Sequence, residues 1–167
     1  MKKKIIIAGF AGIGKTELAK KYRNVVDLDS SDYAYDNSMV QHLSLERRKG
    51  EVRPSNPNWP DNYIEAIKDA TSKYDIVLVW DREDIIKEYL ANNINFSLFY
   101  PDKSDLNNYV LRYRNRGNSE NYIEMKLKQY NERMLFFNKL NVPKTILKDN
   151  KTLEDYLIRN GYPLSKL

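Results

Sequence analysis

The chain has 167 residues, no cysteine and a formal net charge of +5, so we expect one domain over residues 1–167 without disulfides or thiolate metal ligands. No apolar run approaches the ~18 residues that cross a membrane. The basic and apolar N-terminus also lacks a small-residue cleavage site, which favours a cytoplasmic protein. Lysine and arginine are scattered along the sequence, which suits a small anionic ligand better than nucleic acid.

Short apolar strands alternate with helical patterns along the chain. The predicted strands cover residues 4–8, 24–28, 74–80, 95–100 and 144–148. The predicted helices cover residues 16–22, 62–72, 82–92, 104–113, 119–140 and 152–160, with Ser119 and Thr152 as N-caps and Gly161 at the last helix end. This alternation predicts an α/β fold in which a parallel sheet carries helices on both faces. Ligands then bind at the carboxyl ends of the strands.

The first predicted strand leads into GFAGIGKT, residues 9–16, which fits the phosphate-loop pattern G-x-x-x-x-G-K-[ST] without a mismatch. Glycines let backbone N–H groups approach phosphate oxygens closely. Lys15 would reach the β- and γ-phosphates of a nucleotide, and the hydroxyl of Thr16 would bind Mg²⁺. A strand before the loop and a helix after it are the context that this mechanism needs. We expect nucleotide binding along Gly9, Ala11, Gly12, Ile13, Gly14, Lys15, Thr16 and Glu17.

Carboxylates follow the second and third predicted strands. Asp27 and Asp29 lie two residues apart and share a face in an extended chain, and Asp81 follows the apolar run of the third strand. A carboxylate beside the phosphate loop would organise Mg²⁺ or act as a base towards an attacking hydroxyl. The alternative is that Asp29 or the next serine caps the following helix, and that Asp81 caps the helix at residue 82.

The stretch YVLRYRNRGN, residues 109–118, places Arg112 and Arg116 on one helix face. Arginines in such a position would close over a phosphoryl group during its transfer and neutralise its charge. A mobile segment would also exclude water from the reaction. We therefore expect an arginine-bearing lid over about residues 109–120; the alternative is a solvated basic helix face.

A long irregular segment, about residues 30–60, separates the second and third predicted strands. Segments of this length in a small domain usually carry a function. Its arginines at 47, 48 and 53 would hold the phosphate of an acceptor, and aromatic residues at 33, 35, 59 and 63 would stack on a base. The alternative for these aromatic residues is that they cover the edge of the sheet.

Two classes of nucleotide-binding protein do not match the sequence. GTPases carry an N-K-x-D motif that reads the base, whereas the stretch at 138–141 reads NKLN, and no D-x-x-G switch is present. Motor and remodelling ATPases place an acidic Asp-Glu pair after the third strand, where this chain has Asp81 and Arg82. These absences favour a small transferase.

Taken together, GFAGIGKT, VVDLDSSD, VLVWDRED and RYRNRGN resemble the nucleoside monophosphate kinase superfamily. The pattern NPNWPDNY, YDIVLVW and LFYPDKSDLNNYVLRYRNRGN is similar to small nucleotide kinases of bacteriophages and their host genomes. The resemblance implies a three-layer αβα P-loop NTPase fold with a five-stranded parallel sheet in the order 2-3-1-4-5. It also implies ATP, Mg²⁺ and transfer to a nucleotide. It assigns residues 9–16 to the donor, and Arg112 and Arg116 to the lid.

The chain departs from the superfamily at two places. The stretch DRED, residues 81–84, lacks the glycine and proline of the Asp-Gly-x-Pro-Arg-like segment of well-studied members. The Asp-x-Asp after the second strand is closer to shikimate- and gluconate-type kinases. Both departures bear on the identity of the acceptor, and the expected donor site at residues 9–16 is unchanged.

The sequence therefore predicts an ATP- and Mg²⁺-dependent kinase, in particular a (deoxy)nucleoside monophosphate kinase that makes the diphosphate. The alternatives are a kinase of a small alcohol metabolite with Asp29 as the base, a kinase of nucleic-acid 5′ ends, or a non-catalytic module that ATP switches. Either a monomer or a homodimer is compatible with the sequence. The expected catalytic residues are Lys15, Asp29, Arg112 and Arg116, and the expected metal-binding residues are Thr16, Asp27, Asp29 and Asp81.

Overall fold

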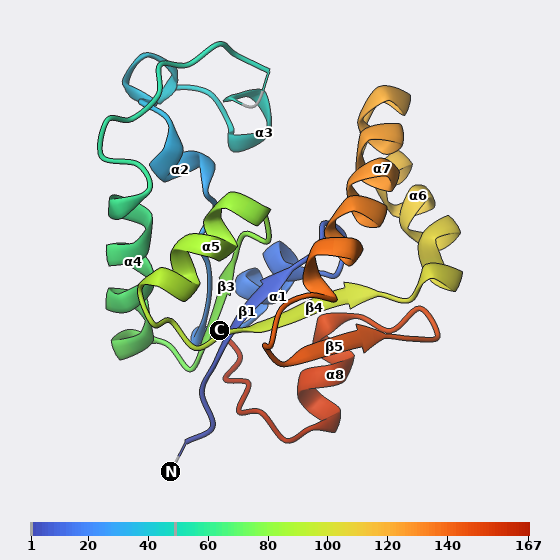
Figure 1. Ribbon diagram of the computed structural model, residues 1–167. Helices are drawn as coiled ribbons and strands as arrows, with labels where there is room; N and C mark the ends of the chain where they lie inside the picture. Colours follow the sequence, from blue (N-terminus) through green and yellow to red (C-terminus); the bar gives the residue numbers. More distant parts are fainter. Residues whose placement is uncertain (1, 49) are drawn as a thin grey trace.

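A five-stranded sheet forms the centre of the protein in the computed structural model, which describes residues 2–48 and 50–167 (Figure 1). The strand order is β2-β3-β1-β4-β5, and all four neighbouring pairs are parallel. This arrangement confirms the predicted fold class. The strands are β1 (Ile5–Gly9), β2 (Val25–Asp27), β3 (Ile76–Val79), β4 (Ser97–Pro101) and β5 (Lys144–Leu147).

Helices cover both faces of this sheet. The chain moves from β1 to β2 in one direction across the sheet and from β3 to β4 in the other, so right-handed crossovers place α1 and α5 on opposite faces. Figure 1 shows α5 in front of the sheet and α1 behind it. The helices are α1 (Lys15–Lys21), α2 (Ser31–Ala34), α3 (Leu45–Arg48), α4 (Asp61–Lys73), α5 (Glu83–Ala91), α6 (Leu106–Asn115), α7 (Glu120–Phe137) and α8 (Leu153–Arg159), with short 3₁₀ turns η1 (Ser38–Val40) and η2 (Lys103–Asp105).

The predicted helix ends are confirmed by their capping contacts. The Ser119 hydroxyl accepts a hydrogen bond from the backbone N–H of Tyr122 at the start of α7. Thr152 and Asp155 form a reciprocal capping box at the start of α8. Gly161 follows α8 with φ of 68°, the left-handed conformation that glycine adopts most easily.

The core lies where the central strands meet the helices of both faces. All four residues of β3 are buried, which explains why its sequence is continuously apolar rather than alternating. At the carboxyl end of this strand, the buried Tyr63 of α4 donates a hydrogen bond to the Leu28 carbonyl and accepts one from the Trp80 N–H. Tyr63 thereby joins the ends of β2 and β3, the edge at which the phosphate loop also lies.

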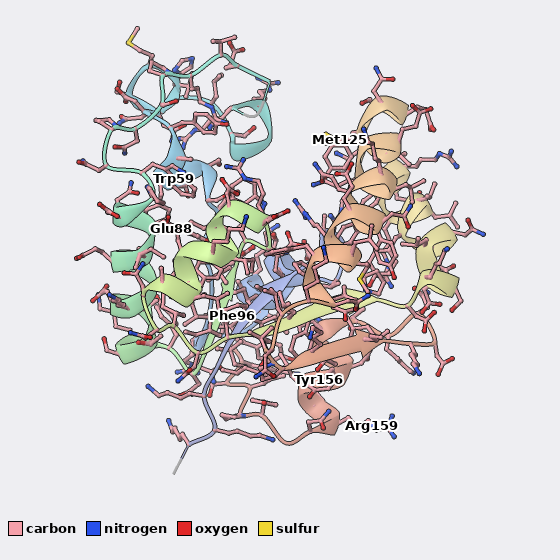
Figure 2. The ribbon with its side chains drawn as sticks, in the orientation of Figure 1. Trp59, Glu88, Phe96, Met125, Tyr156 and Arg159 are labelled. Carbon is pink, nitrogen blue, oxygen red and sulfur yellow. The ribbon has the colours of Figure 1, made fainter. Side chains whose placement is uncertain are left out.

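Residues 30–60 contain α2, η1 and α3, so this segment is less irregular than its sequence indicates. Trp59 stacks on Tyr63 with 5.4 Å between the ring centroids, and Figure 2 shows it beside the start of α4. This tryptophan therefore packs where the segment returns to the sheet. Within the described part of the chain, no helix has the length and apolar character needed to cross a membrane.

Candidate functional site

The phosphate-loop motif forms the turn between β1 and α1. Gly12 and Gly14 have φ of 95° and 101°, which residues with a side chain rarely adopt. A Cβ atom on Gly9 would overlap the Ile13 Cδ1 atom, so a side chain at this position needs the Ile13 side chain to move. The three glycines of the motif therefore have conformational or packing reasons for being there.

Lys15 lies back over the loop at the start of α1. Its ammonium group donates hydrogen bonds to the carbonyl oxygens of Gly9 and Phe10, the second at 3.4 Å. Backbone carbonyls carry only partial charge, so these two hydrogen bonds give the Lys15 ammonium group no fully charged partner. The group is held beside the loop, where a phosphate would compete with the carbonyls for it.

Four charged side chains near Lys15 affect its titration. Burial is the largest cause and lowers the pKa of Lys15 below its ordinary value of 10.5. The negative charges of Asp81 and Asp27 act in the opposite direction, whereas Arg133 and Arg116 lower the pKa further. The structure therefore brings two of the predicted carboxylates, one predicted arginine and one further arginine towards the same lysine.

Thr16 joins α1 to the end of β2. Its hydroxyl donates a hydrogen bond to Asp27 Oδ2 at 2.9 Å. A hydroxyl and a carboxylate side by side are the hard oxygen donors that Mg²⁺ prefers. The predicted metal-binding pair Thr16 and Asp27 is therefore placed together.

Asp29 begins the turn that leads into α2. Its Oδ1 atom accepts a hydrogen bond from the backbone N–H of Ser31 at 2.9 Å, and its carbonyl accepts one from Asp32 at 3.1 Å. This is the local turn-stabilising contact typical of aspartate in loops. One carboxylate oxygen of Asp29 is used in this way, and its role as a base stays a prediction.

Asp81 is buried at the carboxyl end of β3, with 2% of its surface exposed. Its Oδ1 atom accepts a hydrogen bond from Arg133 Nη1 at 2.6 Å. Arg82, and not Asp81, occupies the N-cap position of α5, and that cap has no side-chain hydrogen bond. The capping alternative for Asp81 therefore does not hold in this structure.

The second oxygen of Asp81 is a distinctive feature of the site. Among the residues that the structure describes, Asp81 Oδ2 is buried and has no hydrogen-bond partner. Buried polar atoms in native proteins nearly always have a partner, which can be a water molecule or an ion. This oxygen is therefore placed to accept a hydrogen bond from, or to bind, a group that enters the site.

Arg133 was not predicted from the sequence as a site residue. It lies in the middle of α7, and its guanidinium carbon is 6.0 Å from the ring centroid of Phe10 in the phosphate loop. The sequence does carry a signal for it, because Arg133 follows buried Tyr130 by three residues and precedes buried Phe137 by four. A charged residue on the buried stripe of a helix needs a buried partner, which here is Asp81.

The two predicted lid arginines occupy different environments. Arg112 in α6 donates a hydrogen bond to the Gly12 carbonyl at 2.7 Å and others to the backbone and side-chain oxygens of Asn150. Arg116 follows the last residue of α6 and is close enough to lower the pKa of Lys15. Arg112 therefore binds a backbone carbonyl of the loop, whereas the positive charge of Arg116 acts on Lys15.

Two arginines of the 30–60 segment bind that segment itself. The guanidinium of Arg48 donates hydrogen bonds to three backbone carbonyls, those of residues 40, 41 and 43. Arg53 donates to Asn37 Oδ1 at 2.8 Å and stacks over the Tyr35 ring at 4.4 Å. Both contribute to the shape of the segment, and its role in acceptor binding stays a prediction.

Comparisons with known proteins give information on the fold. No protein-family model matches the chain, and no curated protein matches its sequence. The structure of the Deinococcus radiodurans tunicamycin resistance protein is similar, with a TM-score of 0.53 and 12% sequence identity over 99% of this chain and 100% of that chain. At this identity the likeness concerns the fold alone.

The fold and the loop place the chain in a structural class. An all-parallel sheet in the order β2-β3-β1-β4-β5, with helices on both faces, agrees with the P-loop kinase-like α/β fold. The phosphate-loop motif lies directly after β1, at the carboxyl edge of that sheet. The structural class is therefore the one that the sequence predicted.

Proposed function

We propose that the protein is an ATP- and Mg²⁺-dependent phosphotransferase whose acceptor is a (deoxy)nucleoside monophosphate. The observation that carries this proposal is the convergence of Lys15, the Thr16–Asp27 pair and the buried Asp81–Arg133 pair around one phosphate-loop motif. Each group suits a step of phosphoryl transfer, namely phosphate binding, metal binding and charge neutralisation.

The donor groups fit a magnesium ion that is bound together with a nucleotide. Within residues 2–48 and 50–167, no three His, Cys, Asp or Glu side chains form a group that could hold a metal by themselves. Mg²⁺ bound to nucleotides usually takes one or two protein carboxylates and completes its shell with phosphates and water. Thr16 and Asp27 would supply that small set, with Asp81 Oδ2 as a further acceptor. When bound, the ion supplies positive charge at the phosphate oxygens.

Lys15 would exchange its backbone partners for phosphate oxygens. Its present hydrogen bonds are to the carbonyls of Gly9 and Phe10, which are weaker acceptors than a phosphate. Because the lysine is desolvated, its charge would act on the phosphates through a medium of low dielectric constant. Binding of a triphosphate would therefore relieve the unfavourable burial of this charge.

In this proposal, Arg116 and Arg133 would neutralise the migrating phosphoryl group. Both are close enough to Lys15 to lower its pKa. Arg112 would have to release Gly12 and Asn150 before it could reach the same group. We therefore assign Arg116 the larger part of the role that the sequence gives to the lid.

The acceptor would lie beyond the carboxyl ends of β2 and β3, where aromatic and cationic side chains meet. The Arg82 guanidinium stacks over the Trp80 ring at 4.3 Å and pairs with Asp84, and Trp80 lies 6.4 Å from Trp59 between centroids. A planar base and an anionic phosphate are the groups that such a surface recognises. These side chains support a nucleotide as the acceptor.

The test is ADP release from ATP and Mg²⁺ over a panel of ribo- and deoxynucleoside monophosphates. Lys15→Ala is expected to abolish release, and Lys20→Ala is the matched control because Lys20 lies in the same helix with 68% of its side chain exposed. Release that depends on an acceptor in the wild type and Lys20→Ala, but not in Lys15→Ala, would support the proposal. Release that persists in Lys15→Ala would contradict it.

The same assay separates the alternative acceptors. Small alcohols and an oligonucleotide with a 5′-hydroxyl form two further arms of the panel. An alcohol must lose a proton during transfer, so Asp29→Asn should then abolish turnover, whereas a monophosphate acceptor needs no base and should retain most of it. ATP binding without release on any acceptor would instead favour a module that ATP switches.

A further inference from the structure

Helix α6 contacts the phosphate loop at two consecutive backbone carbonyls. The Tyr113 hydroxyl donates a hydrogen bond to the Ala11 carbonyl at 2.6 Å, and Arg112 Nη1 donates one to the Gly12 carbonyl at 2.7 Å. Tyr113 is 1% exposed, so its hydroxyl has no competition from bulk water. The two contacts come from adjacent residues of one helix and act on adjacent peptide units of the loop.

The geometry of a trans peptide links these contacts to the inside of the loop. In a trans peptide unit the C=O of one residue and the N–H of the next point in opposite directions. The Ala11 carbonyl shares its unit with the Gly12 N–H, and the Gly12 carbonyl shares its unit with the Ile13 N–H. Both units are trans, because the cis peptide bond in the described part of the chain is that between Trp59 and Pro60. Because both carbonyls point to α6, both N–H groups point away from it.

Close packing keeps α6 in this position. A Cβ atom on Gly12 would lie 3.0 Å from the Tyr109 ring and 3.1 Å from the Tyr113 ring, so the helix rests directly on the loop backbone. Tyr113 also packs edge-on against Tyr122 of α7, with 5.8 Å between ring centroids. The Tyr113 ring is therefore held between the loop backbone and the Tyr122 ring.

We propose that α6 orients the phosphate loop for nucleotide binding and that Tyr113 is a positioning residue for this purpose. Its hydroxyl holds the Ala11 carbonyl outwards and thereby presents the Gly12 N–H to the phosphates, and Arg112 does the same for the Ile13 N–H. Donors oriented in advance bind an anion more tightly, because no ordering of the loop opposes binding. The inference deepens the proposed function and requires of it only that the loop binds phosphate.

Tyr113 offers a cleaner test than Arg112. Replacement of Arg112 would remove a positive charge near the bound phosphates, so weaker binding would have two explanations. Tyr113 stays neutral, because burial raises its pKa well above the ordinary value of 10. Tyr113→Phe retains the ring and its packing and removes only the hydroxyl that holds the Ala11 carbonyl.

The matched control is Tyr130→Phe. The Tyr130 hydroxyl is also buried and donates a single hydrogen bond to a backbone carbonyl, that of Pro101 at 2.9 Å, outside the phosphate loop. Both variants lose the same kind of bond, so we expect similar decreases in melting temperature. A purely structural role of Tyr113 would give the two variants the same ligand affinity.

The experiment measures the affinity of both variants and the wild type for Mg²⁺-ATP and for inorganic triphosphate by calorimetry. We expect Tyr113→Phe to bind both ligands about three- to tenfold more weakly than the wild type, the equivalent of about one net hydrogen bond. Tyr130→Phe should remain within about twofold. Equal affinities of Tyr113→Phe and Tyr130→Phe would overturn the inference.

A second measurement reports on the loop directly. In amide-resolved NMR spectra, triphosphate should shift the Gly12 N–H resonance of the wild type more than that of Tyr113→Phe, and equal shifts would contradict the inference. Because binding is measured without an acceptor, the experiment tests the role of Tyr113 independently of phosphoryl transfer. A wild type that binds triphosphate but transfers nothing would refute the phosphotransferase proposal alone, whereas a wild type that binds no triphosphate would refute both.

Discussion

Arg133→Met is the most informative change that the structure offers. Arg133 Nη1 lies 2.6 Å from Asp81 Oδ1, and the exposed fractions of the two side chains are 9% and 2%. Methionine retains the aliphatic stem of arginine but removes the charge. The variant therefore leaves the Asp81 carboxylate buried without its ion-pair partner at the end of β3.

The magnitude follows from the burial of the pair. At an effective dielectric constant of 20, two unit charges at this distance attract by about 6 kcal/mol, and much of this is offset by the cost of their desolvation. Removal of one partner of a buried pair typically costs about 3–5 kcal/mol. For 167 residues the entropy of unfolding is about 350 cal/mol/K, so the melting temperature should fall by about 9–14 °C.

The assay is thermal and urea unfolding of the wild type, Arg133→Met, Asp81→Asn and the double variant. Because the second substitution removes the charge that the first leaves unpaired, the double variant should be more stable than the sum of the two single effects predicts. A cost below about 1 kcal/mol for Arg133→Met, or strict additivity of the two changes, would refute the reasoning that the pair is buried and coupled.

Two further predictions concern the phosphate loop. Gly12→Ala should lower the free energy of unfolding by about 2–4 kcal/mol, because its Cβ atom would meet two tyrosine rings and its φ is 95°. The control is Gly117→Ala, with φ of 84° and no atom within 4 Å of the added Cβ, which should cost only about 1 kcal/mol in urea unfolding. Equal costs of the two substitutions would argue against close packing of α6 on the loop. Burial lowers the pKa of Lys15 in the folded state below 10.5. Below that folded-state pKa the buried lysine is protonated and lowers the free energy of unfolding by the full cost of its burial. This cost is relieved as the pH rises from the folded-state pKa towards 10.5, because the folded protein then loses the proton before the unfolded chain does. The free energy of unfolding of the wild type should therefore rise relative to that of Lys15→Met across this window, and a constant difference would contradict the assigned burial.

Local patterns in the sequence were sufficient for the fold class and for the position of the phosphate-loop motif. Residues 9–16 carry their own conformational requirements, since Gly12 and Gly14 have positive φ, which glycine adopts more easily than any other residue. The capping residues Ser119 and Thr152 likewise contact N–H groups within their own first helical turn. Such features depend on neighbours in the sequence, so they can be predicted without the fold.

The contacts that complete the candidate site join residues far apart in the sequence. Asp81 and Arg133 are separated by 52 positions, and Tyr113 lies 102 positions from Ala11, whose backbone carbonyl accepts its hydrogen bond in the loop. The sequence is compatible with Asp81 as a metal ligand or a helix cap, and neither alternative includes the arginine that pairs with it. The arginine pattern predicts Arg112 in a closing lid, which stays a prediction, and it gives no sign of the hydrogen bond from its guanidinium to the Gly12 carbonyl.

By itself, the sequence determined the order of the strands and of the helices outside residues 30–60, the phosphate-loop motif and the carboxylates at the ends of β2 and β3. Apolar periodicity, glycine conformation and helix capping are local properties, and a parallel sheet directs all strand ends to one edge. Only the tertiary structure decided which charges share that edge with Lys15. The reason is that α6 and α7 reach the loop through packing between distant segments, and the partner of a buried charge depends on which surfaces the fold brings into contact.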